Sequence, residues 1–265
     1  MPQSALQHAE VRALADAATV HRTACGVGDL VWRRWGHANL AARTVILCHG
    51  GSGSWLHWLT TIPSLRADYT VWAVDLPGLG DSSMPPEPLT PEHAGHWLAM
   101  GMRQILAPQA RAHVVAFSFG AHVATFALAE LSDEFGGDLQ DLVSDFTICG
   151  CAALGLIRGA DFSFAKERVG MTDAELQFVH THNLSLLMIR DPSRIDALAV
   201  DVQATNVRRA RFRSRPFAVT DEIKRNLSRV RVPLNAIWGA LDQTASSGVE
   251  LRYAILREHH PELMG

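Results

Sequence analysis

Short apolar runs rich in β-branched residues recur along this chain, separated by longer stretches whose apolar positions have helical spacing. The runs predict strands over residues 44–49, 70–75, 112–117, 143–149 and 233–238. The longer stretches predict helices over about 55–64, 92–107, 119–131 and 246–258. Strands that alternate with helices indicate right-handed crossovers, so the predicted class is α/β with a mostly parallel, doubly wound sheet.

Two segments depart from this alternation. Residues 18–25 and 28–35 read as strands joined at Gly26-Val27-Gly28, which predicts an antiparallel hairpin after a short amphipathic helix over 4–17. Between 153 and 227 the chain has helical segments rich in Arg, His and Phe and no strand-like run. We expect a core from 1–152 and 228–265, with 153–227 inserted as a helical cap over the carboxyl edge of the sheet.

Composition narrows the class of protein. The chain has 265 residues, 48% of them hydrophobic, which is enough for one large core. Its net charge of −3 is too close to zero to indicate a nucleic acid or an anionic membrane surface as partner. Neither a membrane-spanning run nor a secretion signal is visible, so we expect a cytoplasmic protein with a small-molecule substrate. The oligomeric state stays open.

The four cysteines do not have metal-ligand spacing. Cys149 and Cys151 are two apart, and Cys25 and Cys48 lie on or beside apolar strands. Buried free thiols are the simplest interpretation, and no metal or cofactor is expected.

Ser118 is the strongest candidate for chemistry. The apolar strand 112–117 runs directly into Ser118 and Gly120, and a helical pattern follows at once. A serine at such a bend is thrust out above the sheet, which suits a nucleophile. Ala116 stands at the first glycine position of Gly-x-Ser-x-Gly, and a plain strand-to-helix turn is the alternative.

Three segments in order carry a family resemblance: His49-Gly50-Gly51, Asp75-Leu76-Pro77-Gly78-Leu79-Gly80-Asp81-Ser82 and Ala116-Phe117-Ser118-Phe119-Gly120. Together they resemble the α/β-hydrolase superfamily, in its serine-nucleophile branch, over about residues 18–260. The resemblance implies backbone oxyanion donors at Gly51 and Phe119. It also implies that Asp242, in Trp238-Gly239-x-x-Asp242, is the acid of the triad. A turn aspartate that caps the next helix is the alternative.

The glycine-rich loop has two other interpretations. His49 could be a base, but a His-Gly pair at this point more often fixes the shape of the loop. A phosphate-binding loop would need a Gly-Lys-Ser/Thr ending, which is absent here.

The histidine of the triad is not visible. The resemblance implies a base on a loop after one further strand, yet after Asp242 come a helix and then His259-His260-Pro261. A helix of about twelve residues carries the chain some 18 Å, so these histidines should lie far from Ser118. We therefore expect the sequence to stop before the base, with the final strand and helix missing and strand 233–238 left as an open edge.

His180 and His182 are the remaining histidines that could overhang the serine, and Trp55 lies near the glycine loop. We assign all three to substrate binding, with exposed cap histidines and a core tryptophan as alternatives. Five arginines within 208–215 could hold a carboxylate, although a solvated face is the commoner reason for such a run.

Residues 183–215 faintly resemble the cap of carbon–carbon bond hydrolases of ring-fission products. A serine in place of aspartate at position 118 argues against epoxide opening and dehalogenation by the family's aspartyl mechanism. The predicted function is hydrolysis of an ester or of a carbon–carbon bond next to a carbonyl. The alternative is a truncated, catalytically silent relative or a ligand-binding protein.

Overall fold

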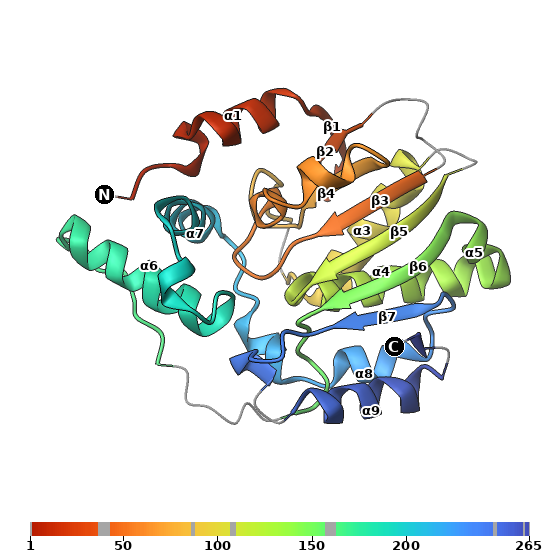
Figure 1. The fold of residues 1–265 in the computed structure, drawn as a ribbon. Coiled ribbons are helices and arrows are strands. Elements are labelled where there is room, and N and C mark those ends of the chain that lie inside the picture. The colour runs from red at the N-terminus through yellow and green to blue at the C-terminus, as the bar shows by residue number, and fades with distance from the viewer. Residues whose placement is uncertain are drawn as a thin grey trace.

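The sheet is the frame of the molecule. The computed structural model describes all residues except 1, 37–42, 86–87, 107–109, 157–162, 246–247, 262 and 265, and only the backbone of 137, 263 and 264. Within these residues eight strands form one sheet in the order β1-β2-β4-β3-β5-β6-β7-β8 (Figure 1). The strands are β1 Thr19–Cys25, β2 Gly28–Trp35, β3 Arg43–Cys48, β4 Thr70–Asp75, β5 Arg111–Phe117, β6 Val143–Cys149, β7 Leu234–Ile237 and β8 Leu263–Met264.

Strand direction follows the prediction. β1 pairs with β2 and β2 with β4 in antiparallel fashion, whereas all pairs from β4 through β3 to β8 are parallel. Every residue of β4 is buried, as expected of a central strand covered on both faces. The predicted α/β class with an amino-terminal hairpin is confirmed.

Helices cover both faces of the sheet. One apolar cluster joins the sheet to α1 Ala9–Asp16 and α2 Ile62–Leu65, and a larger one joins it to α3 Pro91–Ile105 and α4 Phe119–Phe135. The shorter helical elements are η1 Ala5–Gln7, η3 Trp55–Trp58 and α5 Leu139–Leu142. The helix expected over 55–64 is divided into η3 and α2, because Pro63 has no N–H and fits only the first turn of a helix. Among the described helices none is both long and apolar enough to cross a membrane.

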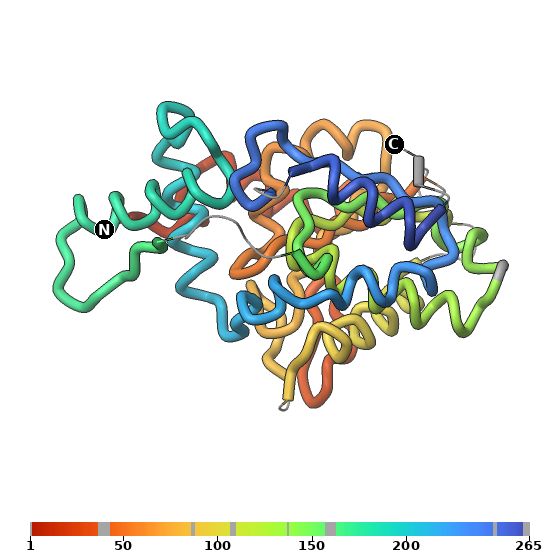
Figure 2. The backbone as a smooth tube through the Cα atoms, turned by 90° about the horizontal axis from the view of Figure 1, so that it is seen from below, coloured from red at the N-terminus to blue at the C-terminus, as the bar shows by residue number. Residues whose placement is uncertain are grey.

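The segment expected to form the cap is divided in space. α6 Asp173–Leu187 and α7 Ala197–Arg209 lie beyond the carboxyl ends of the strands (turquoise in Figures 1 and 2). A capping box of Thr172 and Glu175 starts α6. α8 Glu222–Leu227 instead packs against α4 and α9 Val249–His259, on the same side as the core helices. Residues 222–227 therefore lie with the core, although we expected the cap to reach 227.

The amino-terminal segment is fastened to α7. The backbone N–H of Ala5 donates to Thr205 Oγ1 at 2.8 Å, and His8 Nε2 lies 2.8 Å from Asp201 Oδ2. Arg208 Nη1 donates to the carbonyl of Pro2 at 3.3 Å. These contacts join residues 2–8 to a helix about 200 positions away in the sequence.

The carboxyl-terminal segment corrects one expectation. After α9, Pro261 lies in a turn, and Leu263–Met264 pairs in parallel with β7. A short strand is thus present beside β7, where we expected an open edge, because this turn brings the chain back to the sheet. Leu263 pairs with Leu234, the first residue of β7, so His259 and His260 lie at the amino ends of the strands.

Candidate active site

Ser118 forms the bend between β5 and α4, as predicted. Its backbone has φ +51° and ψ −115°, a region that non-glycine residues adopt at a cost of about 1–3 kcal/mol. The Ser118 N–H donates to the carbonyl of Cys149 at 2.8 Å, which ties the bend to the end of β6. Within the described part of the chain the half-buried Ser118 hydroxyl has no hydrogen-bond partner. The Ser118 side chain therefore does not cap α4, although Ser118 is the residue that precedes the helix.

Two glycines let the loop after β3 approach this bend. A Cβ added to Gly120 would lie 2.5 Å from the carbonyl oxygens of both Cys48 and His49. A Cβ added to Gly50 would lie 2.8 Å from the Phe117 ring and 3.4 Å from Ser118 Cβ. Since no larger residue fits at either position without movement, the loop and the bend pack backbone against backbone.

The two proposed oxyanion donors are neighbours. A Cβ placed on Gly51 would lie 3.6 Å from Phe119 Cβ, so these residues face one another across the gap between loop and helix. The same point is 2.1 Å from Ser214 Oγ, which shows that the segment after α7 packs directly on Gly51.

His49 is fixed within the loop. Its Nδ1 donates to the carbonyl of Gly50 at 2.8 Å, and its Nε2 accepts from the N–H of Leu76 at 2.9 Å. The ring is fully buried, and burial lowers the pKa of His49 to about 4. Both ring nitrogens are occupied, which agrees with a structural role for His49.

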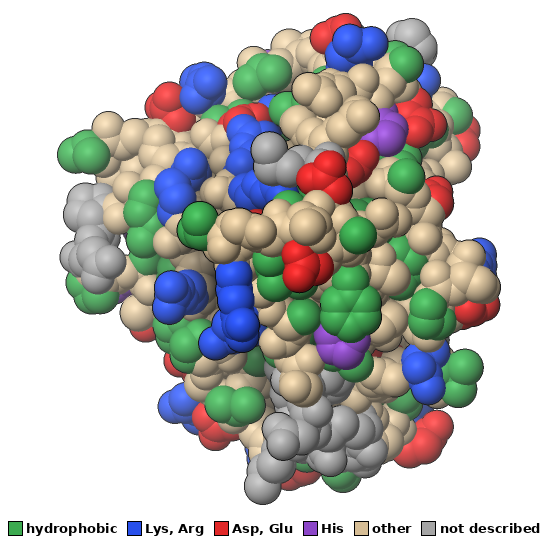
Figure 3. All heavy atoms as spheres, turned by 90° about the vertical axis from the view of Figure 1, so that its left-hand side faces the viewer, with side chains coloured by type: hydrophobic (Ala, Val, Ile, Leu, Met, Phe, Trp, Pro, Cys, Tyr) green, Lys and Arg blue, Asp and Glu red, His purple; other side chains and the backbone are tan. Residues whose placement is uncertain are grey.

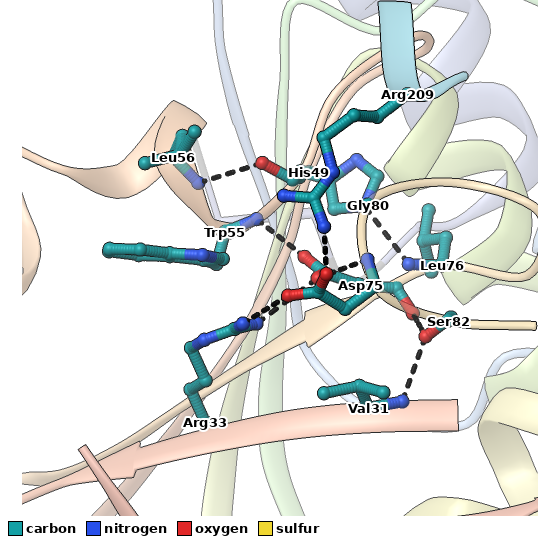
Figure 4. A network of polar contacts seen from close by, with 12 residues as sticks. Val31, Arg33, His49, Trp55, Leu56, Asp75, Leu76, Gly80, Ser82 and Arg209 are labelled. Atoms are coloured by element: carbon teal, nitrogen blue, oxygen red, sulfur yellow. Dashed lines mark hydrogen bonds and ion pairs between the residues drawn. The ribbon is translucent and has the colours of Figure 1, made fainter. Parts of the chain in front are cut away.

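A second polar network, around Asp75 at the end of β4, is fully paired (Figure 4). The buried Asp75 carboxylate accepts from Arg33 at 3.1 Å and from the N–H groups of Trp55 and Asp81 at 2.8 and 2.9 Å. Burial raises the pKa of Asp75, and Arg33 opposes that rise. Arg33 and Arg209 both form ion pairs with Asp81, so the network joins β2, β4 and α7.

The Trp55 ring packs beside this network. Its side chain is 1% exposed, with its ring 5.7 Å from that of Trp35 and 5.2 Å from the Arg33 guanidinium carbon. Trp58, three residues later, reaches the cavity described next.

A cavity of about 390 Å³ opens between the end of α6, η3 and the loops that follow β6 and β7. It lies at the carboxyl ends of the strands, the face that Figure 3 shows, where basic side chains gather beside hydrophobic ones. Asp242 and Phe117 line it, and Ser118 directly follows Phe117 along the chain. The described lining consists of His57, Trp58, Thr61, Phe117, Cys149, Gly150, Ser185, Leu186, Leu187, Met188, Arg190, Ile237, Gly239, Leu241, Asp242 and Gln243.

Asp242 is held by its own loop. Its Oδ1 accepts from the N–H and the hydroxyl of Thr244, each at 2.8 Å. A Cβ built on Gly150 would lie 3.7 Å from Asp242 Oδ2 and 3.3 Å from the Phe117 ring. Gly150 therefore lies between Asp242 and Phe117, the residue before the bend. Asp242 Oδ2 has no partner among the described residues.

His57 is the one histidine among the described residues that line the cavity, and the sequence analysis did not select it. The N–H of Gly50 donates to its Nδ1 at 3.3 Å. Burial and the neighbouring His49 lower the pKa of His57 to about 3. Nothing in the sequence around His57 indicated that its ring would line the cavity.

The two cap histidines that we assigned to substrate binding lie elsewhere. His180 is 1% exposed, with Nε2 2.8 Å from Glu167 Oε1. His182 Nε2 donates to the carbonyl of Ser163 at 2.9 Å, and its ring stacks on Phe178. Both are bound within the cap segment, and neither is among the described lining of the cavity.

The arginine run 208–215 is dispersed and does not converge on one anion site. Arg209 pairs with Asp81, Arg211 donates to the carbonyl of Ser82, and the Arg215 guanidinium lies 4.1 Å from the Phe164 ring centre. No group of three or more His, Cys, Asp or Glu in the described ranges could hold a metal ion.

Comparison with known proteins gives the family. The model of the "Alpha/beta hydrolase family" matches residues 45–262, so the chain belongs to that family. Bifunctional epoxide hydrolase 2 of Rattus norvegicus is 50% identical over 44 residues, which are 16% of this chain but 8% of that protein.

Solved structures are similar over nearly the whole chain. A protein from Burkholderia cenocepacia assigned as an aryl esterase has a TM-score of 0.70 at 19% identity, covering 92% of this chain and 88% of its own. A bacterial membrane phospholipase A has a TM-score of 0.68 at 18% identity, covering 96% and 82%. At these identities the likeness shows the α/β-hydrolase fold.

Proposed function

We propose that this protein is a hydrolase that uses Ser118 as its nucleophile on an ester or on a carbon–carbon bond next to a carbonyl. The observation that carries the proposal is the positive φ of Ser118 at the bend, together with its unpartnered hydroxyl. Strained backbone is retained where the surrounding structure enforces it, and active sites are a common place for it. A serine that only capped α4 would bond to the N–H groups of the first turn.

The neighbouring backbone supplies the means to stabilise a tetrahedral intermediate. When Ser118 Oγ attacks the carbonyl carbon, negative charge develops on the carbonyl oxygen. The N–H groups of Phe119 and Gly51 are the proposed donors, and loss of one such donor typically costs about 3 kcal/mol. Phe119 is also the first residue of α4, so the partial positive charge of the helix amino terminus favours the oxyanion.

Asp242 is proposed to orient the base. The bonds from Thr244 fix its Oδ1, and Oδ2 stays free to accept from an imidazole N–H. His57 does not fit as the base, because its Nδ1 lone pair already accepts from the Gly50 N–H and its Nε2 carries the proton, so neither nitrogen is free to take the proton of Ser118. We therefore place the base outside the described residues that line the cavity.

The cavity argues for a substrate that is largely apolar. Leucines, Met188, Phe117 and Trp58 make up much of its described lining. α6 and α7 are proposed to act as the cap that selects the substrate. Although several relatives are epoxide hydrolases, a serine at position 118 does not fit the aspartyl mechanism of epoxide opening.

A second candidate function is a catalytically silent, ligand-binding relative. The observation that favours it is that no histidine in the described lining of the cavity has the hydrogen bonds of a base.

Covalent labelling separates the two candidates. A fluorophosphonate should modify Ser118, detected as one adduct by intact mass and located by peptide mapping. The Ser118→Ala variant should not react, whereas Ser144→Ala, a serine on β6 away from the cavity, should react like the wild type. A wild type that stays unlabelled would favour the silent relative.

A further inference from the structure

His57 presents two different edges to its surroundings. Nδ1 and Cε1 face the glycine loop, since Gly50 N lies 3.3 Å from Nδ1 and a Cβ on Gly53 would lie 2.4 Å from Cε1. The opposite edge carries Nε2. No described residue bonds to Nε2, and Nε2 is not one of the buried polar atoms that lack a partner. Nε2 is therefore accessible, and it faces the cavity that His57 lines.

The bond from Gly50 also fixes the tautomer. A neutral imidazole has one donor and one acceptor nitrogen, and Nδ1 is here the acceptor. The proton therefore sits on Nε2. The titratable or charged groups around the ring are His49, packed edge to face at 6.0 Å, and Cys149, Arg190 and Asp242 across the cavity. Burial and His49 keep the pKa of His57 far below neutrality, so the ring stays an uncharged donor.

The ring has little freedom to turn. Phe117 packs against it edge to face at 5.8 Å, and η3, which carries it, is capped by Ser54. Ser54 Oγ in turn donates to Asn206 Oδ1 of α7 at 2.6 Å. A donor held on a rigid support loses little entropy when a ligand binds.

We infer that His57 Nε2–H binds a neutral acceptor oxygen on the acyl part of the substrate, so the cavity selects esters that carry a second carbonyl or ether oxygen. This inference rests on the proposed function for its substrate class. Gly50, which donates to the His57 ring, also lies next to Ser118. We therefore expect the acceptor oxygen on the same substrate molecule, further along the acyl chain than the carbonyl that Ser118 attacks. An uncharged donor favours a ketone or ether oxygen over an ammonium group, which has no acceptor.

A matched pair of esters tests it. We expect wild type to hydrolyse 4-nitrophenyl 4-oxopentanoate with a kcat/KM about tenfold higher than 4-nitrophenyl pentanoate, the range of one hydrogen bond. In His57→Phe this ratio should fall to about one, and His57→Gln, which keeps an N–H donor, should restore part of it. His96→Phe, on α3 and outside the described lining, should keep the wild-type ratio. Equal rates for the two esters in wild type would overturn the inference.

A binding measurement separates this inference from the proposed function. In ¹⁵N-histidine-labelled Ser118→Ala, the oxo ester should shift the His57 Nε2 resonance, and the plain ester should shift it less. Before ligand is added, the resonances should report a neutral ring protonated on Nε2 at pH 6. If wild type hydrolyses neither ester but the oxo ester still shifts Nε2, the proposed function fails and the inference stands. A ring protonated on Nδ1, or equal shifts with both esters, would refute the inference.

Discussion

Two sets of serine, histidine and aspartate lie at opposite ends of the same sheet. At the amino end, His113 of β5 bonds through Nδ1 to Asp145 Oδ2 at 2.6 Å and to Ser144 Oγ at 3.0 Å. Ser144 Oγ also lies 3.2 Å from Asp145 Oδ2. The three side chains satisfy one another on β5 and β6, and none of them is among the described residues that line the cavity beside Asp242.

The set at the carboxyl end has the opposite character. Ser118 is strained, and its hydroxyl, His57 Nε2 and Asp242 Oδ2 have no partners among the described residues. Polar groups inside a protein are normally paired, so a cluster of unpaired ones beside a cavity indicates a place for a ligand. Residue type alone does not distinguish the two sets; unmet hydrogen bonds and backbone strain do.

The largest effect should come from the two serines. We expect Ser118→Ala to lower kcat/KM for a short-chain 4-nitrophenyl ester by on the order of 10⁶-fold, because the nucleophile is lost. Ser144→Ala should stay within about twofold of wild type. Equal loss in both variants would mean that the amino-end set takes part in the reaction.

The two aspartates should differ nearly as much. Asp242→Asn should lower kcat roughly 10⁴-fold, since an amide cannot orient and stabilise a protonated imidazole as a carboxylate does. Asp145→Asn should leave kcat unchanged. Steady-state kinetics on both variants decide this, and a normal kcat in Asp242→Asn would remove Asp242 from the mechanism.

Asp75 also lies at the carboxyl end of the sheet, but its carboxylate is fully paired, so we expect it to contribute to stability. Asp75→Ala removes one of the two carboxylates paired with Arg33 and leaves the N–H groups of Trp55 and Asp81 without their acceptor, and we expect a loss of about 3–5 kcal/mol in the free energy of unfolding. Asp133→Ala breaks an exposed pair with Arg229 and should cost less than about 1 kcal/mol. Denaturant titration measures both. Similar losses would show that the Asp75 network contributes no more than a surface pair.

Buried histidines should make the fold sensitive to acid. Burial lowers the pKa of His49 and of His122 from 6.5 to about 4, so between these values the unfolded chain binds protons that the folded chain does not. Stability is therefore full above pH 6.5 and falls as the pH drops to 4, by on the order of 3 kcal/mol per histidine. Unfolding curves at several pH values measure the loss, and His122→Phe should remove the share of that one histidine, about 3 kcal/mol. A flat profile would contradict burial as the cause.

The smallest effect should come from His113. His113→Phe removes one paired histidine at a half-exposed position, and we expect a loss of about 1 kcal/mol in stability with unchanged ester hydrolysis. Thermal unfolding and the esterase assay are the two measurements. A drop in hydrolysis without a drop in stability would erase the contrast between the two ends of the sheet.

Much of the fold follows from local patterns in the sequence. β4 is found where the apolar run 70–75 predicts it, because all six positions are buried and carry the signal. Errors arise where one residue or a distant contact decides. Pro63 interrupts a helical pattern, and α8 lies with the core because its apolar face meets α4 and α9.

The site is less predictable than the fold. The strand–serine–glycine order marks Ser118, since bend and helix are adjacent in sequence. His57 could not be found, because its orientation depends on the folding of a glycine loop back upon itself. The partners of the arginines in 208–215 could not be predicted either, because the partner of Arg209 is Asp81, 128 positions away in the sequence.

The bonds between residues 2–8 and α7 make the start of the chain a mechanical brace for that helix. Any outward movement of α7 has to break these bonds or move residues 2–8 together with the helix. A fluorophore at Ser4 would therefore report displacement of α7 without touching the cavity, and a bulky fusion partner at the same end would load the helix directly.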